Sequence, residues 1–182
     1  WAVEQNHVEL LNQALEGTSR LYDLQVRYEE GEHLFQRALD QLPADRQWTR
    51  ARLLIRQGRF CRLSGRIEQA GKLLRQGLDL LRHPEMAGVD TPKEEAHALQ
   101  QLGWIEMDSQ SNFAEARRLF QQSLNLYQAA GDQFETAHAL HRLGLASWNL
   151  GSQDEAGRFW AESLTILRSL GAQGGVASLL RD

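Results

Sequence analysis

Five arginines at helical spacing are the first residues in this sequence that could do chemistry. Arg52, Arg56, Arg59, Arg62 and Arg66 recur every three or four positions, which would place them along one face of a helix. Arginine makes paired hydrogen bonds to carboxylates and phosphates. Such a stripe can therefore bind an acidic partner, a nucleic-acid backbone, or acidic side chains of the flanking segments. A solvated charged face is the fourth interpretation, and the spacing leaves all four open.

The charge distribution places this stripe in one basic segment. Residues 44–83 have ten basic and three acidic side chains, a net charge of +7, whereas residues 1–43 carry −5 and residues 84–182 carry −6. The net charge of the whole chain is −4, which argues against a general nucleic-acid binder. An acidic protein or peptide is therefore a better candidate partner for this segment than nucleic acid.

Residues that could hold a metal or carry catalysis are sparse. Glu135, His138 and His141 share one helical face at three-residue spacing, but polar groove-lining histidines are far commoner than such a metal site. Cys61 is the only cysteine, which rules out an internal disulfide, and it fits a small packed residue better than a nucleophile. The sequence has neither a glycine-rich phosphate loop nor an evident nucleophile and base. We therefore expect no enzyme activity, no cofactor and no metal.

Internal repetition indicates the elements that position these residues. The segment 96–103 returns 41 residues later as 137–144, and two weaker copies with similar internal spacing lie upstream. Apolar residues recur within a copy at the helical period of three and four, as in Ala116, Phe120, Leu124 and Tyr127. The repetition predicts a single array over residues 1–182, with helix pairs at about 4–43, 44–90, 91–131 and 132–172 and the start of a fifth at 173–182.

Start and stop signals agree with these pairs. Helix starts are predicted by three N-cap sequences, Thr91-Pro92, Asp132 with Glu135, and a capping box from Ser152 to Glu155. Helix ends are predicted by Pro43 and Pro84, and by the C-terminal glycines Gly131 and Gly171. No stretch shows the alternation of a half-buried strand, so we expect an all-α fold.

The repeated units resemble tetratricopeptide repeats. In the fourth unit the residues at the signature spacing are Leu140, Leu143, Gly144, Ala146, Leu150, Gly151, Ala156, Trp160 and Ser163. The resemblance implies a right-handed superhelix of antiparallel helix pairs, in which small residues let paired helices approach closely. Units of about 40 residues, rather than 34, are similar to those of large bacterial signalling proteins, including STAND-type ATPases and transcription activators.

The resemblance also implies which residues face a partner. The first helix of each pair lines the concave side of such arrays, and the candidate partner-binding residues are Arg52, Arg59, Arg62, His97, Gln100, Trp104, His138, His141, Trp148 and Asn149. Tryptophan and arginine often dominate binding energies, so we expect a groove for an acidic segment with an apolar anchor. Ordinary packing of Trp104 and Trp148 between helices is the alternative.

These features predict a non-enzymatic protein-interaction module. We expect it to be the sensor or scaffold segment of a longer, cytoplasmic bacterial regulatory protein, because the chain begins and ends inside the repeat pattern. A sensor of a small ligand or signalling peptide is a second hypothesis, and self-association through the repeat ends is a third. No apolar run reaches the roughly 20 residues of a membrane span, so a membrane partner is not expected.

Overall fold

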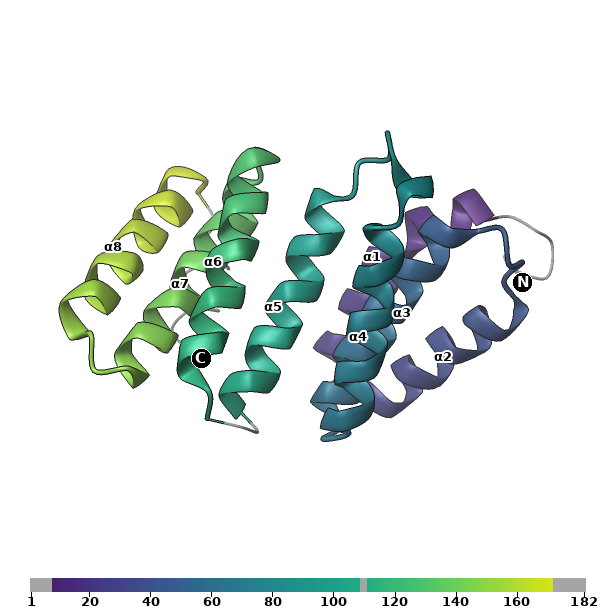
Figure 1. Ribbon diagram of the computed structural model, residues 1–182, viewed down its shortest axis with the longest axis horizontal. Coiled ribbons are helices and arrows are strands. Elements are labelled where there is room, and N and C mark those ends of the chain that lie inside the picture. The colour runs from purple at the N-terminus through teal and green to yellow at the C-terminus, as the bar shows by residue number, and fades with distance from the viewer. Residues whose placement is uncertain (1–7, 109–110, 172–182) are drawn as a thin grey trace. The chain divides into compact units, whose positions relative to one another are not determined.

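The computed structural model describes residues 8–108 and 111–171, and in these residues it contains helices and no strand. The helices follow one another along the chain as four pairs, drawn in Figure 1. They are α1 (Val8–Leu24), α2 (Tyr28–Gln41), α3 (Gln47–Leu63), α4 (Ile67–Leu81), α5 (Pro92–Asp108), α6 (Phe113–Ala129), α7 (Gln133–Asn149) and α8 (Gln153–Ser169), with a 3-10 turn at Pro84–Met86. The all-α fold class is therefore confirmed.

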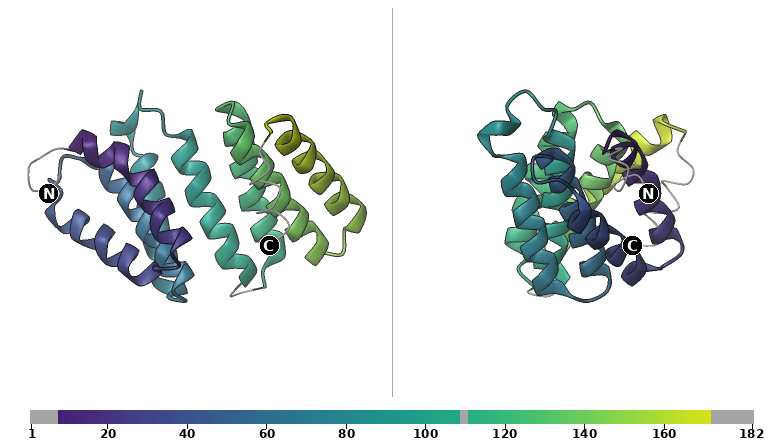
Figure 2. Two further views of the ribbon diagram at one scale, coloured as in Figure 1. Left: turned by 180° about the vertical axis from the view of Figure 1, so that it is seen from behind. Right: turned by 90° about the vertical axis from the view of Figure 1, so that its right-hand side faces the viewer.

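The helices form two compact units, residues 1–94 and residues 95–182, and the boundary falls in the first turn of α5. In the first unit α3 packs against α2 and α4, and α1 packs against α2 and α3. In the second unit α7 packs against α6 and α8. The two views of Figure 2 show these neighbours within each unit. The prediction that all 182 residues make one array stays a prediction.

Small residues allow the helices of a pair to approach closely, as the repeat signature requires. A Cβ atom on Gly103 of α5 would lie 2.5 Å from the Phe120 ring of α6, so only glycine fits there. Gly144 of α7 faces the ring of Trp160 on α8 in the same way. The Trp160 indole also donates a hydrogen bond from Nε1 to the carbonyl oxygen of His141 at 3.2 Å. These two glycines thus fix the spacing within the third and fourth pairs.

Most of the expected helix boundaries are confirmed. Pro43 and Pro84 follow the ends of α2 and α4, and Gly131 and Gly171 follow the ends of α6 and α8 with φ of 66° and 62°. The Asp132 carboxylate accepts a hydrogen bond from the backbone N–H of Glu135 at 3.2 Å, which caps α7. These local signals therefore set the helix ends.

The capping box at Ser152 is a wrong prediction. Although α8 begins after Ser152, this described residue makes no side-chain cap hydrogen bond. The Glu155 carboxylate is engaged elsewhere: it accepts hydrogen bonds from the Ser147 hydroxyl at 3.1 Å and from Arg117 at 2.7 Å. The Glu155 carboxylate that a capping box would use therefore binds Ser147 and Arg117 instead.

Candidate functional site

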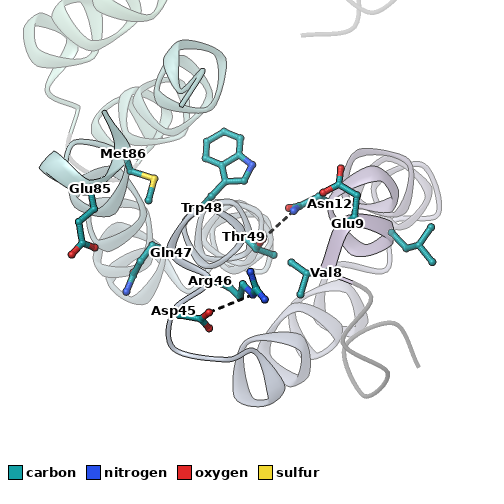
Figure 3. A pocket seen from close by; sticks show the side chains of 11 residues that line it. Val8, Glu9, Asn12, Asp45, Arg46, Gln47, Trp48, Thr49, Glu85 and Met86 are labelled. Carbon is teal, nitrogen blue, oxygen red and sulfur yellow. Dashed lines mark hydrogen bonds and ion pairs between the residues drawn. The ribbon is translucent and has the colours of Figure 1, made fainter. Parts of the chain in front are cut away.

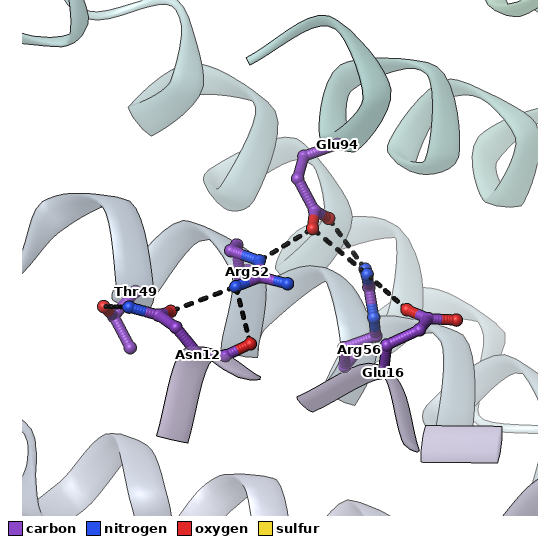
Figure 4. Close-up of polar contacts among 6 residues, drawn as sticks. All are labelled: Asn12, Glu16, Thr49, Arg52, Arg56 and Glu94. Atoms are coloured by element: carbon purple, nitrogen blue, oxygen red, sulfur yellow. Dashed lines mark hydrogen bonds and ion pairs between the residues drawn. The ribbon is translucent and has the colours of Figure 1, made fainter. Parts of the chain in front are cut away.

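The arginine stripe forms a buried ion-pair cluster in the first unit. Arg56 on α3 donates from Nη1 to Oε2 of Glu94 at 2.8 Å and from Nη2 to Glu16 on α1 at 3.0 Å (Figure 4). Arg52, one helical turn earlier, donates from Nε to the other Glu94 oxygen at 2.7 Å. It also donates from Nη1 to the backbone oxygen of Asn12 at 3.0 Å. The cluster joins α1, α3 and the first turn of α5.

Burial makes this cluster unlike a surface ion pair. The Arg56 side chain is 4% exposed and that of Glu94 is 11% exposed. Burial alone would raise the pKa of Glu94, but the charges and hydrogen bonds of Arg56 and Arg52 outweigh it and hold that pKa below its usual 4.5. Burial alone would lower the pKa of Arg56, but Glu94 and Glu16 raise it instead. Both partners therefore stay charged at neutral pH.

Two more members of the stripe also pair within the chain. Arg59 on α3 donates to Oδ2 of Asp23 on α1 at 2.8 Å. Arg66 pairs with the buried carboxylate of Glu32 on α2, and it lies beyond the end of α3, at the N-cap of α4. The expectation that all five arginines lie on one helix is therefore wrong for Arg66. Arg62, the last predicted binding residue of this unit, is half-buried on α3.

The candidate residues of α5 are largely packed. The ring of Trp104 meets that of Phe120 edge-on at a centroid distance of 5.8 Å and belongs to the apolar core of the second unit. Gln100 is buried, and His97 is half-buried. The packing interpretation of Trp104 is therefore supported more strongly than its role as a groove anchor.

The candidate residues of α7 are more accessible. Trp148 is 51% exposed, and its ring lies 5.9 Å from that of Trp160 at an interplanar angle of 35°. The ring centroid of His141 lies 6.4 Å from that of the same Trp160. Asn149 is exposed and donates from Nδ2 to the backbone oxygen of Leu145 at 2.8 Å. The exposed indole of Trp148 is thus next to the indole of Trp160, which is held by its hydrogen bond to His141.

His138 adds an uncharged aromatic surface on the same helix. Its ring lies 4.6 Å from that of the exposed Phe134, in an edge-on arrangement. Burial, together with the nearby charges of Arg142 and His141, lowers the pKa of His138 to about 4. The side chain is therefore neutral at physiological pH.

A hollow in the first unit was not predicted from the sequence. It has a volume of about 600 Å³ and lies where the starts of α1 and α3 meet the 3-10 turn (Figure 3). Its lining includes Trp48, Met86, Val8, Glu9, Asp45 and Glu85. The only signal for it in the sequence is the loop at residues 83–90, which widens the repeat spacing and brings Glu85 and Met86 beside the start of α3.

Three further expectations concern a metal site, a membrane span and self-association. Among residues 8–108 and 111–171, no three His, Cys, Asp or Glu side chains gather as a metal site. No helix in this described part is long and apolar enough to cross a membrane. The partial fifth unit at 173–182 lies outside the described residues, so self-association through that end stays a prediction.

Solved structures with this fold are helical-repeat proteins. The chain superposes on BtubC (BKLC) from P. vanneervenii with a TM-score of 0.70 at 16% identity, covering 90% of this chain and 66% of that one. It also matches a putative kinesin light chain from Podosopora anserina, described as having nearly identical TPR-like repeats, with a TM-score of 0.65 at 16% identity over 96% of this chain and 87% of that one. For MamA the TM-score is 0.58 at 16% identity, covering 93% and 89% of the two chains.

These matches show a fold and no closer kinship. The chain spans only 66% of the length of BtubC, and all the identities are far below those of close relatives. No protein-family model matches the chain, and no curated protein sequence does. The likeness supports a tetratricopeptide-like repeat fold.

Proposed function

We propose that this chain binds a partner peptide or domain through an apolar anchor at Trp148, as the sensor or scaffold segment of a larger bacterial regulatory protein. The observation that carries the proposal is the half-exposed indole of Trp148, supported from beneath by Trp160. An aromatic ring held in place loses little conformational entropy on binding, and exposed tryptophans of this kind are typical binding hot spots.

The electrostatics of the two units support an apolar partner more than an acidic one. The guanidinium groups of Arg52 and Arg59 already hydrogen-bond Glu94 and Asp23, so an acidic peptide would have to displace these carboxylates. On α7 the neighbouring His138 is neutral at physiological pH because its pKa is about 4. We therefore narrow the expected partner to a segment with an aromatic or aliphatic anchor, and an acidic character is secondary.

Peptide selection tests the anchor directly. Peptides are selected from a random library on the immobilised chain, and their affinities for the wild type and four variants are measured by fluorescence anisotropy. Trp148→Ala should weaken binding by about tenfold or more, the usual loss at a hot spot. Leu170→Ala, which truncates another exposed apolar side chain of the same unit, is the matched control and should leave the affinity unchanged.

Two arginine variants test whether acidic residues of the peptide contribute to binding. Arg59→Ala and Arg62→Ala should change the affinity by less than about threefold if the apolar anchor dominates. A larger loss in these variants than in Trp148→Ala would restore the acidic-partner hypothesis. Equal affinity of all three variants and the wild type would remove the proposed groove altogether.

The hollow beside Trp48 supports a second candidate function, sensing of a small ligand. Its volume of about 600 Å³ lies within the range of small-molecule sites, and it combines apolar walls with several carboxylates. A thermal-shift screen of small cationic and aromatic molecules tests this hypothesis. A ligand that stabilises the wild type, but not Trp48→Ala, would support it, and a screen without such a ligand would count against it.

A further inference from the structure

The outer face of α1 has an apolar stripe that no described part of the chain covers. Leu10, Leu21 and Leu24 are 47%, 52% and 75% exposed. Ala14 is also exposed, and no described atom lies within 4 Å of a Cβ atom placed on Gly17. These residues follow one another at steps of four and three, which puts them on a single face of the helix.

The stripe is distinct from the face that anchors α1 in its unit. Leu15 is 1% exposed and packs in a core cluster with Phe35 and Leu39 of α2, while Val8 and Leu11 are partly buried against the same cluster. The helix therefore has two apolar faces, and only one of them is used by the first unit. A second apolar face on a helix of this length indicates a second packing partner.

Equivalent positions in later helix pairs show what kind of partner fits. When Ser19 of α1 is aligned with Gly58 of α3 in the next helix pair, Ala14 corresponds to Leu53 and Leu21 corresponds to Phe60. Leu53 and Phe60 are fully buried in the same core cluster as residues of α2, the second helix of the preceding pair. Thus two positions that are open on α1 are covered on α3 by a preceding second helix.

The fourth pair repeats this arrangement. When Ser19 is aligned with Gly144, Ala14 and Leu21 correspond to Ala139 and Ala146 of α7. Both alanines are fully buried in the core cluster that contains residues of α6. The α6 residues in that cluster include Phe120, Leu124 and Tyr127. The covering helix therefore presents aromatic and leucine side chains at i, i+4 and i+7.

Charge adds a second element of recognition. Arg66, at the start of the second helix of the second pair, forms an ion pair with Glu32 of the preceding second helix, α2. Its equivalent in the first helix pair is Arg27, which is 49% exposed and pairs with the exposed Glu30 one turn along. Exposed pairs of this kind are weak and easily exchanged. A covering helix with a glutamate at the position of Glu32 could take over Arg27.

We propose that the stripe Leu10, Ala14, Gly17, Leu21 and Leu24 is a docking site for an amphipathic helix of a partner protein, which lies on α1 as α6 lies on α7. The partner helix has aromatic and leucine anchors at i, i+4 and i+7 and an acidic residue near Arg27. A second copy of α1 fits less well, because antiparallel pairing would set Gly17 opposite Gly17 and leave a void at the centre.

A peptide with the sequence of α6 and the substitution Arg117→Glu, which places an acidic residue at the position of Glu32, is a probe of the stated chemistry. It consists of residues 112–130, labelled with a fluorophore and made helical by a covalent link between positions 121 and 125, which are exposed neighbours on α6. We expect saturable binding to the full chain by fluorescence anisotropy. The peptide variant Leu124→Glu, which places a charge in the buried seam, should bind at least about tenfold more weakly.

Variants of the chain locate the site. Leu21→Glu and Gly17→Arg should each weaken peptide binding by about tenfold or more, because they place a charge and bulk in the stripe. Leu170→Glu is the matched control, with an exposed leucine of similar accessibility outside α1, and should bind as the wild type does. Both stripe positions are exposed, so circular dichroism and thermal stability should be preserved.

Three results would overturn the proposal. The first is an absence of saturable binding by the helical peptide. The second is binding that Leu21→Glu and Gly17→Arg leave unchanged, which would place the peptide elsewhere. The third is a dimer in sedimentation velocity that Leu21→Glu abolishes, since a second copy would then be the occupant. None of these results depends on Trp148, so the proposed function succeeds or fails separately.

Discussion

The substitution Glu94→Gln tests whether the arginine stripe is mainly an internal ion-pair cluster. Glutamine keeps the size of the side chain and its capacity to accept a hydrogen bond, but it removes the charge that faces Arg56. The Arg56 guanidinium, 4% exposed, would then lose its buried charged partner, while the side chain of Glu16, its other carboxylate partner in the cluster, is 70% exposed. Loss of one partner from a buried pair costs about 3–5 kcal/mol, so we expect a free-energy loss of this size.

Urea denaturation followed by circular dichroism measures this loss. With a slope of about 2 kcal/mol per molar urea, the unfolding midpoint of the first unit should fall by about 2 M. Hydrogen exchange of α3 amides should rise in parallel, because α3 carries Arg56. Acid should act in the same direction: the pKa of Glu94 is lowered, so its stabilisation is present above pH 4.5 and is lost as the pH falls through the folded-state value.

Glu115→Gln is the matched control. It makes the same change in the first turn of another helix, where Glu115 pairs with Arg118 at 2.6 Å but both side chains are substantially exposed. Surface pairs contribute about 0–1 kcal/mol, so this variant should be nearly as stable as the wild type. Equal losses for the two variants would refute the argument from burial.

A double substitution separates the ion pair from the general effect of mutation. Arg56→Met combined with Glu94→Leu replaces both charges by apolar side chains of similar volume. Such replacements of buried pairs are often neutral, so the double variant should recover at least half of the loss seen in Glu94→Gln. A double variant less stable than either single variant would show that the charges do not act as a pair.

Three other predictions concern packing and titration. Gly58→Ala should cost about 1–3 kcal/mol in urea denaturation, because its Cβ would lie 2.8 Å from Leu74, whereas Gly157→Ala, with no described atom within 4 Å, should be neutral or stabilising. Thermal stability should fall as the pH decreases from 6.5 to about 4, because His138 is then protonated in the unfolded chain but stays neutral in the folded chain. The variant His138→Gln should flatten this pH dependence of stability, and an unchanged slope would contradict the prediction. Burial raises the pKa of Cys61 to about 11, so a thiol reagent should label it only after unfolding, and rapid labelling of the native chain would show that it is accessible.

The repeat pattern anticipated the helices because helix formation depends on residues close together in the chain. Gly131 and Gly171 end helices through their own positive φ angles, and Asp132 caps α7 through a backbone amide only three residues away. The Ser152 motif failed where a residue from another helix intervened, since Arg117 binds the Glu155 carboxylate. Local signals were thus reliable until a tertiary contact competed for the same group.

The candidate site could be predicted only in part from the sequence. The sequence singles out the arginines and tryptophans as residues of interest, but it does not show which residues of other helices they meet. Arg56 meets Glu94, 38 residues away, and no spacing rule within one helix predicts that contact. Trp104 and Trp148 both lie on the first helix of a pair, yet one packs against Phe120 and the other is half-exposed.

By itself the sequence determined the helix pairs, the glycines that let them approach, and the uneven distribution of charge. Only the tertiary structure decided that four of the arginines neutralise carboxylates of this chain, that Trp148 remains accessible, and that the outer face of α1 is open. The physical reason is the distance along the chain over which each interaction acts. Backbone hydrogen bonds and helical periodicity act over a few residues, whereas ion pairing and burial depend on which helices meet in the folded chain.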